Sequence, residues 1–444
     1  MDNIKAIELL SKLMEQDKIG ELRGALMMMN PVDIADYMDT LETDRMLRLY
    51  RLLSKDISAD VFAYMSDEQR QKLMESIGDA ETARLISDMF VDDAVDLLEE
   101  LPANLVRRVL SNVNEDQRKT INRFLSYPDN SAGSIMTPEF CEFHEGVTVS
   151  EALNYLKVNS VDKETIYTLY ILDSGRRLVG TLPLRKLILA DGDAKVETLM
   201  NPASLFANTL DDQEAVAELV RKYDLMSVPI VDKEGRMVGI VTADDIMDVL
   251  QDEATEDIEK MNALLPSEDA YIKTGPFTLA KNRLPWLLFM MLSSILTETI
   301  IEGFESRLSI AFAACIPMLM GTGGNCGSQS STLAIRGLAL GEIAPRDALR
   351  ILWKEFRVSL IVSMVLACLS FSIQKFVFAR EISEAVVISF AMICTVILSK
   401  SIGCTLPLLA KKLKLDPAIM AAPLITTIVD VCSLLILVMF AALV

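Results

Sequence analysis

The chain has 444 residues, of which 51% are hydrophobic, and it carries 43 basic and 63 acidic residues. Its net charge of −20 disfavours binding to nucleic acid, because the phosphates would be repelled. The single histidine, His144, argues against histidine-based catalysis and against an imidazole-rich zinc, copper or nickel site.

Acidic and hydrophobic residues are unevenly distributed along the chain. From Leu284 to the end, twelve basic residues nearly balance ten acidic ones, so the acidic excess lies before Leu284. An acidic soluble half therefore precedes an apolar half, and each half is long enough for one or two domains. Of the seven cysteines only Cys141 lies in the soluble half, and no CxxC pair occurs. This cysteine usage indicates a cytosolic soluble half without a disulfide framework.

Residues 40–130 predict short amphipathic helices that repeat about every twelve residues. Segments such as DAETARLISDMF and VDDAVDLLEELP have Asp, Ser or Asn near the breaks, where these residues act as N-caps. Successive short helices with such a period predict a small helical superhelix. Asp92 and Asp96 are four residues apart and share a helix face, for which a solvated surface is the default interpretation.

Residues 134–250 contain an internal duplication. SIMTPEF matches TLMNPAS, and ILDSGRRLVGTLPLRKLI matches IVDKEGRMVGIVTADDIM. Each copy predicts a helix, a strand, a glycine turn, a strand and a helix, a pattern that resembles a pair of CBS domains. Such pairs can bind adenine nucleotides, and the second copy has the ribose-binding pattern of Gly239, Thr242 and Asp245. The first copy has Pro183 and Lys186 in place of the Thr and Asp, so the resemblance implies ATP as a weakly supported ligand.

A strongly acidic helix is predicted directly after the second copy, in DDIMDVLQDEATEDIEKMNALL. A solvated linker helix is one interpretation of this segment. However, like charges three and four residues apart destabilise a helix unless a cation or a partner neutralises them. The segment is therefore also a candidate element of a cation-dependent switch.

Five hydrophobic stretches are each long enough to cross a bilayer, which takes about 20 residues. They fall at 284–303, 309–340, 355–378, 384–410 and 417–443. Basic residues concentrate before the first stretch, between the second and third, and between the fourth and fifth. By the positive-inside rule the N-terminal half faces the cytoplasm and the C-terminus faces outward.

Three ionisable residues, Glu298, Lys400 and Asp430, lie well inside these stretches. A charge near the bilayer centre costs at least about 2.5 kcal/mol, so such residues face a bundle interior, a partner or water. Asp430 is predicted either to form a buried ion pair with Lys400 or to be an ion site in a pore. Thr426 and Thr427 lie one turn earlier and add oxygen atoms of the kind that suits Mg²⁺. Glu298 and Lys400 are interpreted as partners of each other or of other polar groups.

The second stretch contains IPMLMGTGGNCGSQSSTLAIRGLAL, whose glycines disfavour a regular helix. Broken backbone at membrane depth is tolerated where it lines a watery cavity, and it would expose carbonyl groups to a cation. Close helix packing through small residues is the alternative. The stretch lacks the GK[ST] of a P-loop.

The whole chain resembles the MgtE family of magnesium channels and transporters. The resemblance rests on GFES (303–306), GTGGNCGSQS (321–330), LDPAIMAAPLITTIVD (415–430) and DEATEDIEK (252–260). It implies a multidomain membrane protein with four parts. These are an all-α helical N-domain superhelix (1–130), an α/β CBS-domain pair (131–250), an acidic connecting plug helix (251–275) and an all-α five-helix transmembrane domain (276–444).

The resemblance also implies a homodimer in contact with membrane lipid, with a pore at the dimer axis between the second and fifth spans of both copies. The aspartate matching Asp430 would hold hydrated Mg²⁺ there, together with backbone carbonyls near the Gly-Asn stretch. Cytosolic Mg²⁺ would close the channel by binding between the N-domain, the CBS pair and the plug. The implied sensing residues are Asp92, Asp96, Glu214, Asp224, Asp245, Asp248, Glu253, Glu256, Asp257 and Asp416, with Asp60 as a weaker candidate.

The sequence thus predicts a Mg²⁺-selective, passive, channel-like transporter of the cytoplasmic membrane that internal Mg²⁺ closes. It is not predicted to be an enzyme, since no nucleophile–base set is visible. Two alternatives remain: a transporter of another divalent cation such as Co²⁺, and a non-transporting membrane sensor whose CBS pair binds nucleotide.

Overall fold

The computed structural model describes residues 3–442 apart from 17, 162, 204, 267–270, 272–273, 305–308 and 421. Two residues of the GFES motif, Glu305 and Ser306, lie outside the described residues. The chain folds into two compact units, Met1–Leu250 and Gln251–Val444. Each unit is described by itself.

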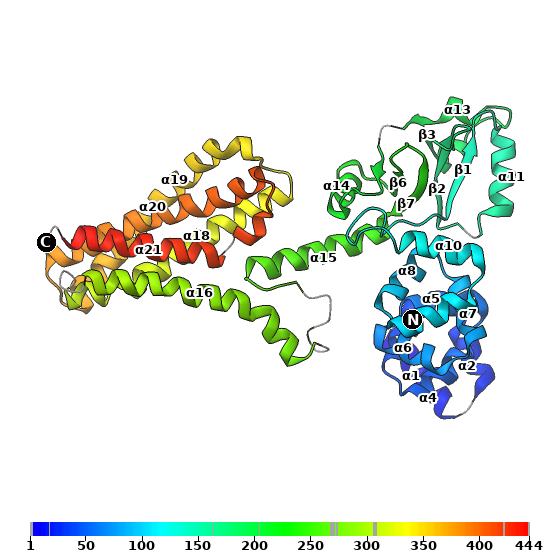
Figure 1. Cartoon of the computed structure of the whole chain (residues 1–444), viewed down its shortest axis with the longest axis horizontal. Helices are drawn as coiled ribbons and strands as arrows, with labels where there is room; N and C mark the ends of the chain where they lie inside the picture. Colours follow the sequence, from blue (N-terminus) through cyan, green and yellow to red (C-terminus); the bar gives the residue numbers. More distant parts are fainter. Residues whose placement is uncertain are drawn as a thin grey trace. The chain divides into compact units, whose positions relative to one another are not determined.

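Ten helices form the first part of unit 1 among its described residues (Figure 1). They are α1 (Asn3–Glu15), α2 (Ile19–Leu26), α3 (Pro31–Asp39), α4 (Thr43–Tyr50), α5 (Lys55–Ala63), α6 (Asp67–Ser76), α7 (Asp79–Asp88), α8 (Val91–Glu100), α9 (Ala103–Asn112) and α10 (Glu115–Phe124). The helices α6 to α10 begin twelve residues apart, which confirms the predicted period. Asparagine side chains cap the N-termini of two of these helices. Asn30 accepts a hydrogen bond from the backbone N–H of Val32, and Asn114 accepts one from the backbone N–H of Gln117.

The duplicated segment forms two small sheets. The first has the order β1-β2-β3-β4 and the second the order β5-β6-β7, each with one parallel and otherwise antiparallel pairings. The strands are β1 (Phe140–His144), β2 (Thr165–Leu172), β3 (Leu178–Pro183), β4 (Asn201–Pro202), β5 (Ala207–Asn208), β6 (Ser227–Val231) and β7 (Met237–Thr242). The helices are α11 (Val149–Asn159), α12 (Leu184–Ile188), α13 (Val196–Leu199) and α14 (Gln213–Tyr223). The predicted pair of α/β copies is confirmed.

One hydrophobic core joins the helical part to the second α/β copy. Phe62 and Phe124 of the helices belong to the same buried cluster as Val228 and Ile246 of that copy. Apolar burial contributes about 25 cal/mol per Å², so a shared core holds the two parts of unit 1 together. This packing fixes where the acidic side chains of the helices lie relative to the α/β pair.

The acidic segment forms a single helix, α15 (Ala243–Met261), which ends four residues before the end of the predicted segment at Leu265 and well short of the plug-helix boundary at 275. Ile246 and Val249, in its first two turns, are buried, whereas its later residues are mostly exposed or half-buried. The helix runs across the division between the units at Leu250 and Gln251. The same helix therefore carries carboxylates that belong to each of the two units.

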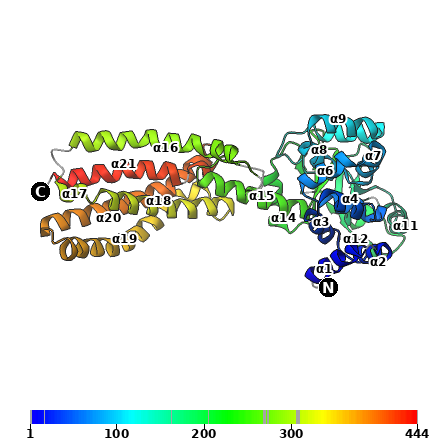
Figure 2. The same ribbon diagram turned by 90° about the horizontal axis from the view of Figure 1, so that it is seen from below.

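Unit 2 is a bundle of long helices that lie side by side (Figure 2). It contains α16 (Pro276–Phe304), α17 (Ile310–Ala313), α18 (Ile316–Ala339), η2 (Pro345–Asp347), α19 (Ala348–Ser372), η3 (Ile373–Val377), α20 (Ile382–Lys412), η4 (Pro417–Met420) and α21 (Ala422–Ala441). Within the described residues five helical segments are long and apolar enough to cross a membrane. These five segments confirm the predicted spans, since each overlaps one of them.

The expectation that glycines break the second span is wrong, because α18 is continuous through the glycine-rich segment. A Cβ on Gly403 of α20 would lie 2.2 Å from the carbonyl oxygen of Gly327, and one on Gly323 would lie 2.8 Å from Thr395 and Val429. The glycines let α18 approach α20 and α21 at backbone distance, which is the alternative stated above. The packing gain offsets the low helix propensity of glycine.

Candidate ion-binding sites

Unit 1 gathers carboxylates from three separate segments. Asp92 and Asp93 lie in the first turn of α8, where the helix dipole favours acidic residues. Glu164 directly precedes β2, and Asp245 lies in the first turn of α15. We call Asp92, Asp93, Glu164 and Asp245 the first acidic cluster.

Burial and mutual repulsion make this cluster electrostatically unfavourable. Burial raises the pKa of Asp92 well above its usual range, and the charges of Asp93, Asp245 and Glu164 raise it further. Burial, followed by neighbouring carboxylates, raises the pKa of Asp93 to about 6 and that of Glu164 to about 7. Burial also raises the pKa of Asp245, although hydrogen bonds from Thr242 oppose that rise.

Two oxygen atoms of the cluster are buried without a hydrogen-bond donor among the described residues: Oδ1 of Asp92 and Oε2 of Glu164. A buried polar atom without a partner costs roughly 1–3 kcal/mol, and more when it is charged. Protons or a cation can offset this cost. Among the described residues no three acidic, histidine or cysteine side chains converge closely enough to hold a bare metal ion. Mg²⁺ fits nevertheless, because it dehydrates reluctantly and is often bound through its water shell.

Asp96 and Asp248 flank the first acidic cluster on α8 and α15. Both side chains are exposed, and the charge of Asp248 adds to the upward pKa shift of Asp245. They therefore contribute negative potential around the cluster.

Glu214 and Asp224 lie at opposite ends of α14. Both are exposed, and Asp224 is the left-handed C-cap residue of the helix, with φ of 51°. Ten residues of helix separate them by about 15 Å, so one ion cannot contact both. The structure therefore does not unite these two predicted sensing residues in one site.

A second acidic cluster lies within unit 2, where the end of α15 faces the loop before α21. It consists of Glu253, Glu256, Asp257 and Asp416, all half-buried. Burial raises the pKa of Asp257, and the charge of Asp416 raises it further. Oδ1 of Asp416 also accepts a hydrogen bond of 2.8 Å from the backbone N–H of Ala418, which fixes the carboxylate at the start of η4.

Lys260 already places a cation in the second acidic cluster. Its ammonium nitrogen lies 2.6 Å from Oε1 of Glu256 and 2.8 Å from Oδ2 of Asp416. Burial alone would lower the pKa of Lys260, but these two contacts raise it above its usual value. Lys260 was not among the predicted site residues, although it is the one basic residue of the segment DEATEDIEK.

Asp430 borders a cavity of about 480 Å³ between α16, α18 and α21. The cavity contains three carboxylates within a mostly apolar bundle. Its lining residues are Ser294, Thr297, Glu298, Ile301, Glu302, Met320 and Asp430. Thr426 and Thr427 donate hydrogen bonds to the carbonyl oxygen of Pro423 and do not line the cavity. Glu298, which had no definite predicted partner, lines the Asp430 cavity.

Lys400 pairs with neither Asp430 nor Glu298, and the alternative that it pairs with another polar group is confirmed. The ammonium nitrogen of Lys400 lies 3.7 Å from Oε2 of Glu355, and Ser330 connects the two with hydrogen bonds of 3.2 and 2.8 Å. Lys400 and Glu355 are both largely buried, so each compensates the charge of the other. Glu355 is the first residue of the third predicted span and was not among the ionisable residues predicted to lie well inside a span. The contacts given for the Lys400 ammonium are therefore with Glu355 and Ser330 and not with Asp430.

Two residues of the ribose-binding pattern in the second α/β copy, Thr242 and Asp245, are hydrogen-bonded to each other. The hydroxyl and the backbone N–H of Thr242 both donate to Oδ2 of Asp245. Gly239 is needed because a Cβ there would lie 2.8 Å from the carbonyl oxygen of Thr137. Asp245 therefore belongs to the nucleotide pattern and to the first acidic cluster.

Comparison with known proteins places these features in a family. Residues 316–440 match the model of the MgtE divalent cation transporter, residues 29–130 the MgtE intracellular N domain, and residues 196–252 the CBS domain. The chain is 36% identical to the magnesium transporter MgtE of Thermus thermophilus, over 98% of this chain and 97% of the relative. It is 33% identical to that of Bacillus subtilis, over 96% and 94%.

Two solved structures resemble the soluble part. The soluble part of a magnesium transporter shares 32% identity, with a TM-score of 0.54 over 57% of this chain and 100% of that one. The cytosolic domain of the Mg²⁺ channel MgtE in complex with ATP shares 34% identity, with a TM-score of 0.52 over 54% and 98%. Because relatives named magnesium transporter MgtE are 33–36% identical to the chain over nearly its whole length, the chain belongs to the MgtE family of divalent cation transporters.

Proposed function

We propose that the protein is a channel-like transporter that conducts Mg²⁺ passively and is closed by Mg²⁺ in the cytoplasm. The observation that carries this proposal is the half-buried Asp430, which borders a cavity of the mostly apolar helix bundle together with the exposed Glu298 and Glu302. A carboxylate at that depth is costly unless it faces water or a cation. The relatives over nearly the whole chain are magnesium transporters.

The ion in the pathway keeps most of its water shell. Oxygen ligands suit Mg²⁺, and its reluctance to dehydrate makes one carboxylate that accepts hydrogen bonds from the bound water sufficient. The absence of histidine anywhere near this region disfavours softer metals. By family resemblance, a second copy of the chain completes the pathway at a twofold axis, with lipid around the bundle.

The N-terminal domains face the cytoplasm and the C-terminus faces outward. The basic residues beside the spans support this orientation. The four segments 1–130, 131–250, 251–275 and 276–444 then act as sensor, regulatory pair, plug and pore domain. Influx follows the electrochemical gradient, since nothing in the proposal couples transport to an energy source.

Closure uses the two acidic clusters. Each cluster places carboxylates of α15 against another element of the same unit: α8 and the start of β2 in unit 1, and Asp416 in unit 2. Without cations the carboxylates repel, and with bound Mg²⁺ they hold α15 in place. A ligand shifts a conformational equilibrium only by binding one state better, and this difference in repulsion supplies the preference.

ATP is a candidate modulator at the CBS pair. A related cytosolic domain forms a complex with ATP, and the pattern Gly239, Thr242 and Asp245 supports a ribose site in this chain. Because Asp245 would serve both ATP and the first acidic cluster, nucleotide binding and Mg²⁺ binding would influence each other.

Replacing Asp430 by Asn removes the charge while keeping the shape. Hydrogen bonds to a charged group contribute about 1.5–3 kcal/mol, so Mg²⁺ flux into proteoliposomes should fall by roughly 10–100-fold. The exposed Glu342→Gln serves as control and should conduct like the native chain. Native flux in a folded Asp430→Asn protein would refute the site assignment, and comparison of Mg²⁺ with Co²⁺ in the same assay tests the alternative cargo.

The double variant Asp92→Asn/Asp245→Asn should still conduct but resist closure. It removes two of the four repelling charges that Mg²⁺ would bridge, so the internal Mg²⁺ concentration needed for half-closure should rise about tenfold or more. Asp193→Asn changes an exposed aspartate of the first α/β copy and should leave closure unchanged. If the double variant closes at the native Mg²⁺ concentration, the first acidic cluster is not the sensor.

Lys260→Gln should make closure more dependent on Mg²⁺. The resident ammonium is then replaced by an ion recruited from solution, so the closure curve should become steeper and shift to higher Mg²⁺. Partly exposed ion pairs contribute on the order of 1 kcal/mol, which corresponds to a shift of about fivefold. Lys260→Arg keeps the charge and should close normally. A curve for Lys260→Gln that overlays the native one would show that Lys260 has no part in gating.

A further inference from the structure

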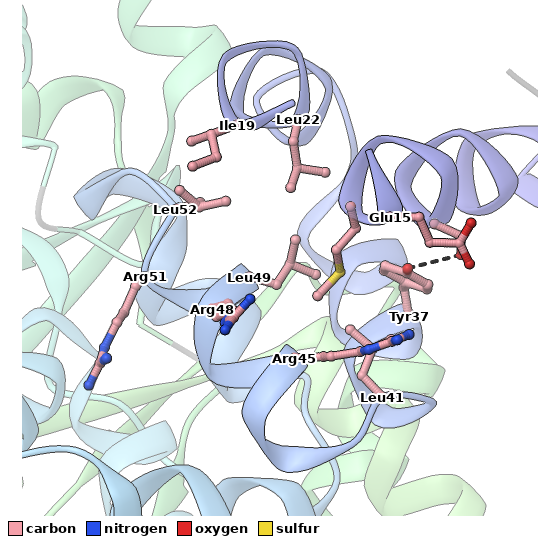
Figure 3. A pocket seen from close by; sticks show the side chains of 12 residues that line it. Glu15, Ile19, Leu22, Tyr37, Leu41, Arg45, Arg48, Leu49, Arg51 and Leu52 are labelled. Atoms are coloured by element: carbon pink, nitrogen blue, oxygen red, sulfur yellow. Dashed lines mark hydrogen bonds between the residues drawn. The ribbon is translucent and has the colours of Figure 1, made fainter. Parts of the chain in front are cut away.

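A second cavity, in the N-terminal helices, has no part in the ion pathway or the acidic clusters. It has a volume of about 650 Å³ and lies between α1, α2, α3 and α4 (Figure 3). This volume is in the usual range for pockets that bind small molecules. Its lining residues are Ser11, Met14, Glu15, Ile19, Leu22, Tyr37, Leu41, Arg45, Arg48, Leu49, Arg51 and Leu52.

The inner wall of the cavity is apolar. Leu22 and Leu49 are 4% and 0% exposed and belong to the main core of unit 1, and Leu41 and Leu52 pack against that core. Ile19 extends this apolar wall and is itself 53% exposed. The hydroxyls of Tyr37 and Ser11, 2.9 Å apart, satisfy each other. The wall thus offers hydrophobic contact to a ligand without requiring many hydrogen bonds.

The rim of the cavity is cationic. Arg45 and Arg48 lie on α4 one turn apart, and Arg51 follows at its C-cap. In Figure 3 Arg45 extends toward Tyr37 and Glu15, Arg48 lies beside Leu49, and Arg51 points away from the centre. All three are exposed, and none forms an ion pair with another residue that the structure describes. Glu15 is the one carboxylate in the lining.

This charge is opposite to that of its surroundings. The chain as a whole has a net charge of −20, and acidic residues also outnumber basic ones within residues 1–130. Exposed arginines alone are ordinary, but two of them beside an apolar cavity provide both halves of a site for an amphiphilic anion. The planar guanidinium of arginine matches the geometry of phosphate and carboxylate oxygens and binds them through paired hydrogen bonds.

We propose that this cavity binds an anionic amphiphile, namely an organic phosphate monoester whose apolar body contacts Leu22, Leu49 and Leu52. The phosphate accepts hydrogen bonds from Arg45 and Arg48, and the hydrocarbon part leaves water. Such a ligand can come from two sources, a soluble organic phosphate or the monoester headgroup of a phospholipid. The shared chemistry is the phosphate monoester attached to an apolar group.

The test uses the full chain in nanodiscs of phosphatidylcholine and hexyl phosphate as the probe, with binding measured by calorimetry. Saturable binding is expected, and Arg45→Ala/Arg48→Ala should weaken it by about tenfold or more. Arg107→Ala, which changes an exposed arginine of α9, is the matched control and should bind normally. Inorganic phosphate and hexanol, each of which supplies one half of the ligand, should bind at least about tenfold more weakly than hexyl phosphate.

A second preparation, with phosphatidic acid in the nanodisc, distinguishes the sources. Competition with hexyl phosphate would assign the site to the lipid headgroup, whereas unchanged affinity would assign it to a soluble phosphate. No saturable binding to the native chain, or equal binding to the arginine double variant, would overturn the proposal. Equal binding of inorganic phosphate alone would also overturn it, because the apolar wall would then contribute nothing.

Discussion

Carboxylates held close together and away from water are the constraint on which the soluble part of this protein depends. The core shared by the helices and the second α/β copy brings Asp92, Asp93, Glu164 and Asp245 together, although they come from three separate segments. Burial and repulsion then make the charged state unfavourable, which is why their pKa values rise. A structure that assembles such a cluster is stabilised by whatever neutralises it. The proposed closure by Mg²⁺ rests on this helix, because α15 carries Asp245 at one end and residues of the second acidic cluster at the other.

The chain compensates buried negative charge in three different ways. In the helix bundle of unit 2, the ammonium of Lys400 compensates the charge of Glu355, and the hydroxyl of Ser330 forms a hydrogen bond with each of them. This pair is structural. At the end of α15, Lys260 compensates part of the charge of Glu256 and Asp416, while Asp257 keeps a raised pKa. In the first acidic cluster, burial and the neighbouring carboxylates raise the pKa of Asp93 to about 6 and outweigh the charge of Arg70, which lowers it. The first acidic cluster and the Asp430 cavity are the places that we propose for the ion, because the charge of their carboxylates is compensated least.

Much of the fold could be predicted because it follows from periodic patterns. The helices from Asp67 onward begin every twelve residues, and the five spans follow from hydropathy and length. The membership of the clusters could not be predicted in the same way. Asp93 and Glu164 have no spacing signal that links them to Asp245, and Lys260 meets Asp416 across 156 positions of sequence. The glycine-rich span is a continuous helix, as the packing alternative implied, because close contact with Gly403 offsets the low helix propensity of glycine; helix propensity alone could not decide between the two.

Proton release on Mg²⁺ binding tests the central claim most directly. Raised pKa values mean that the folded state binds protons on the first acidic cluster between about pH 4 and 7, a range in which isolated carboxylates are already ionised. Mg²⁺ must displace these protons, so calorimetric titration at about pH 6.5 in buffers of different ionisation enthalpy should show net proton release. The account predicts that release in the native chain and a clear reduction in Asp92→Asn/Asp245→Asn. Mg²⁺ binding without proton release, or equal release in both proteins, would contradict it.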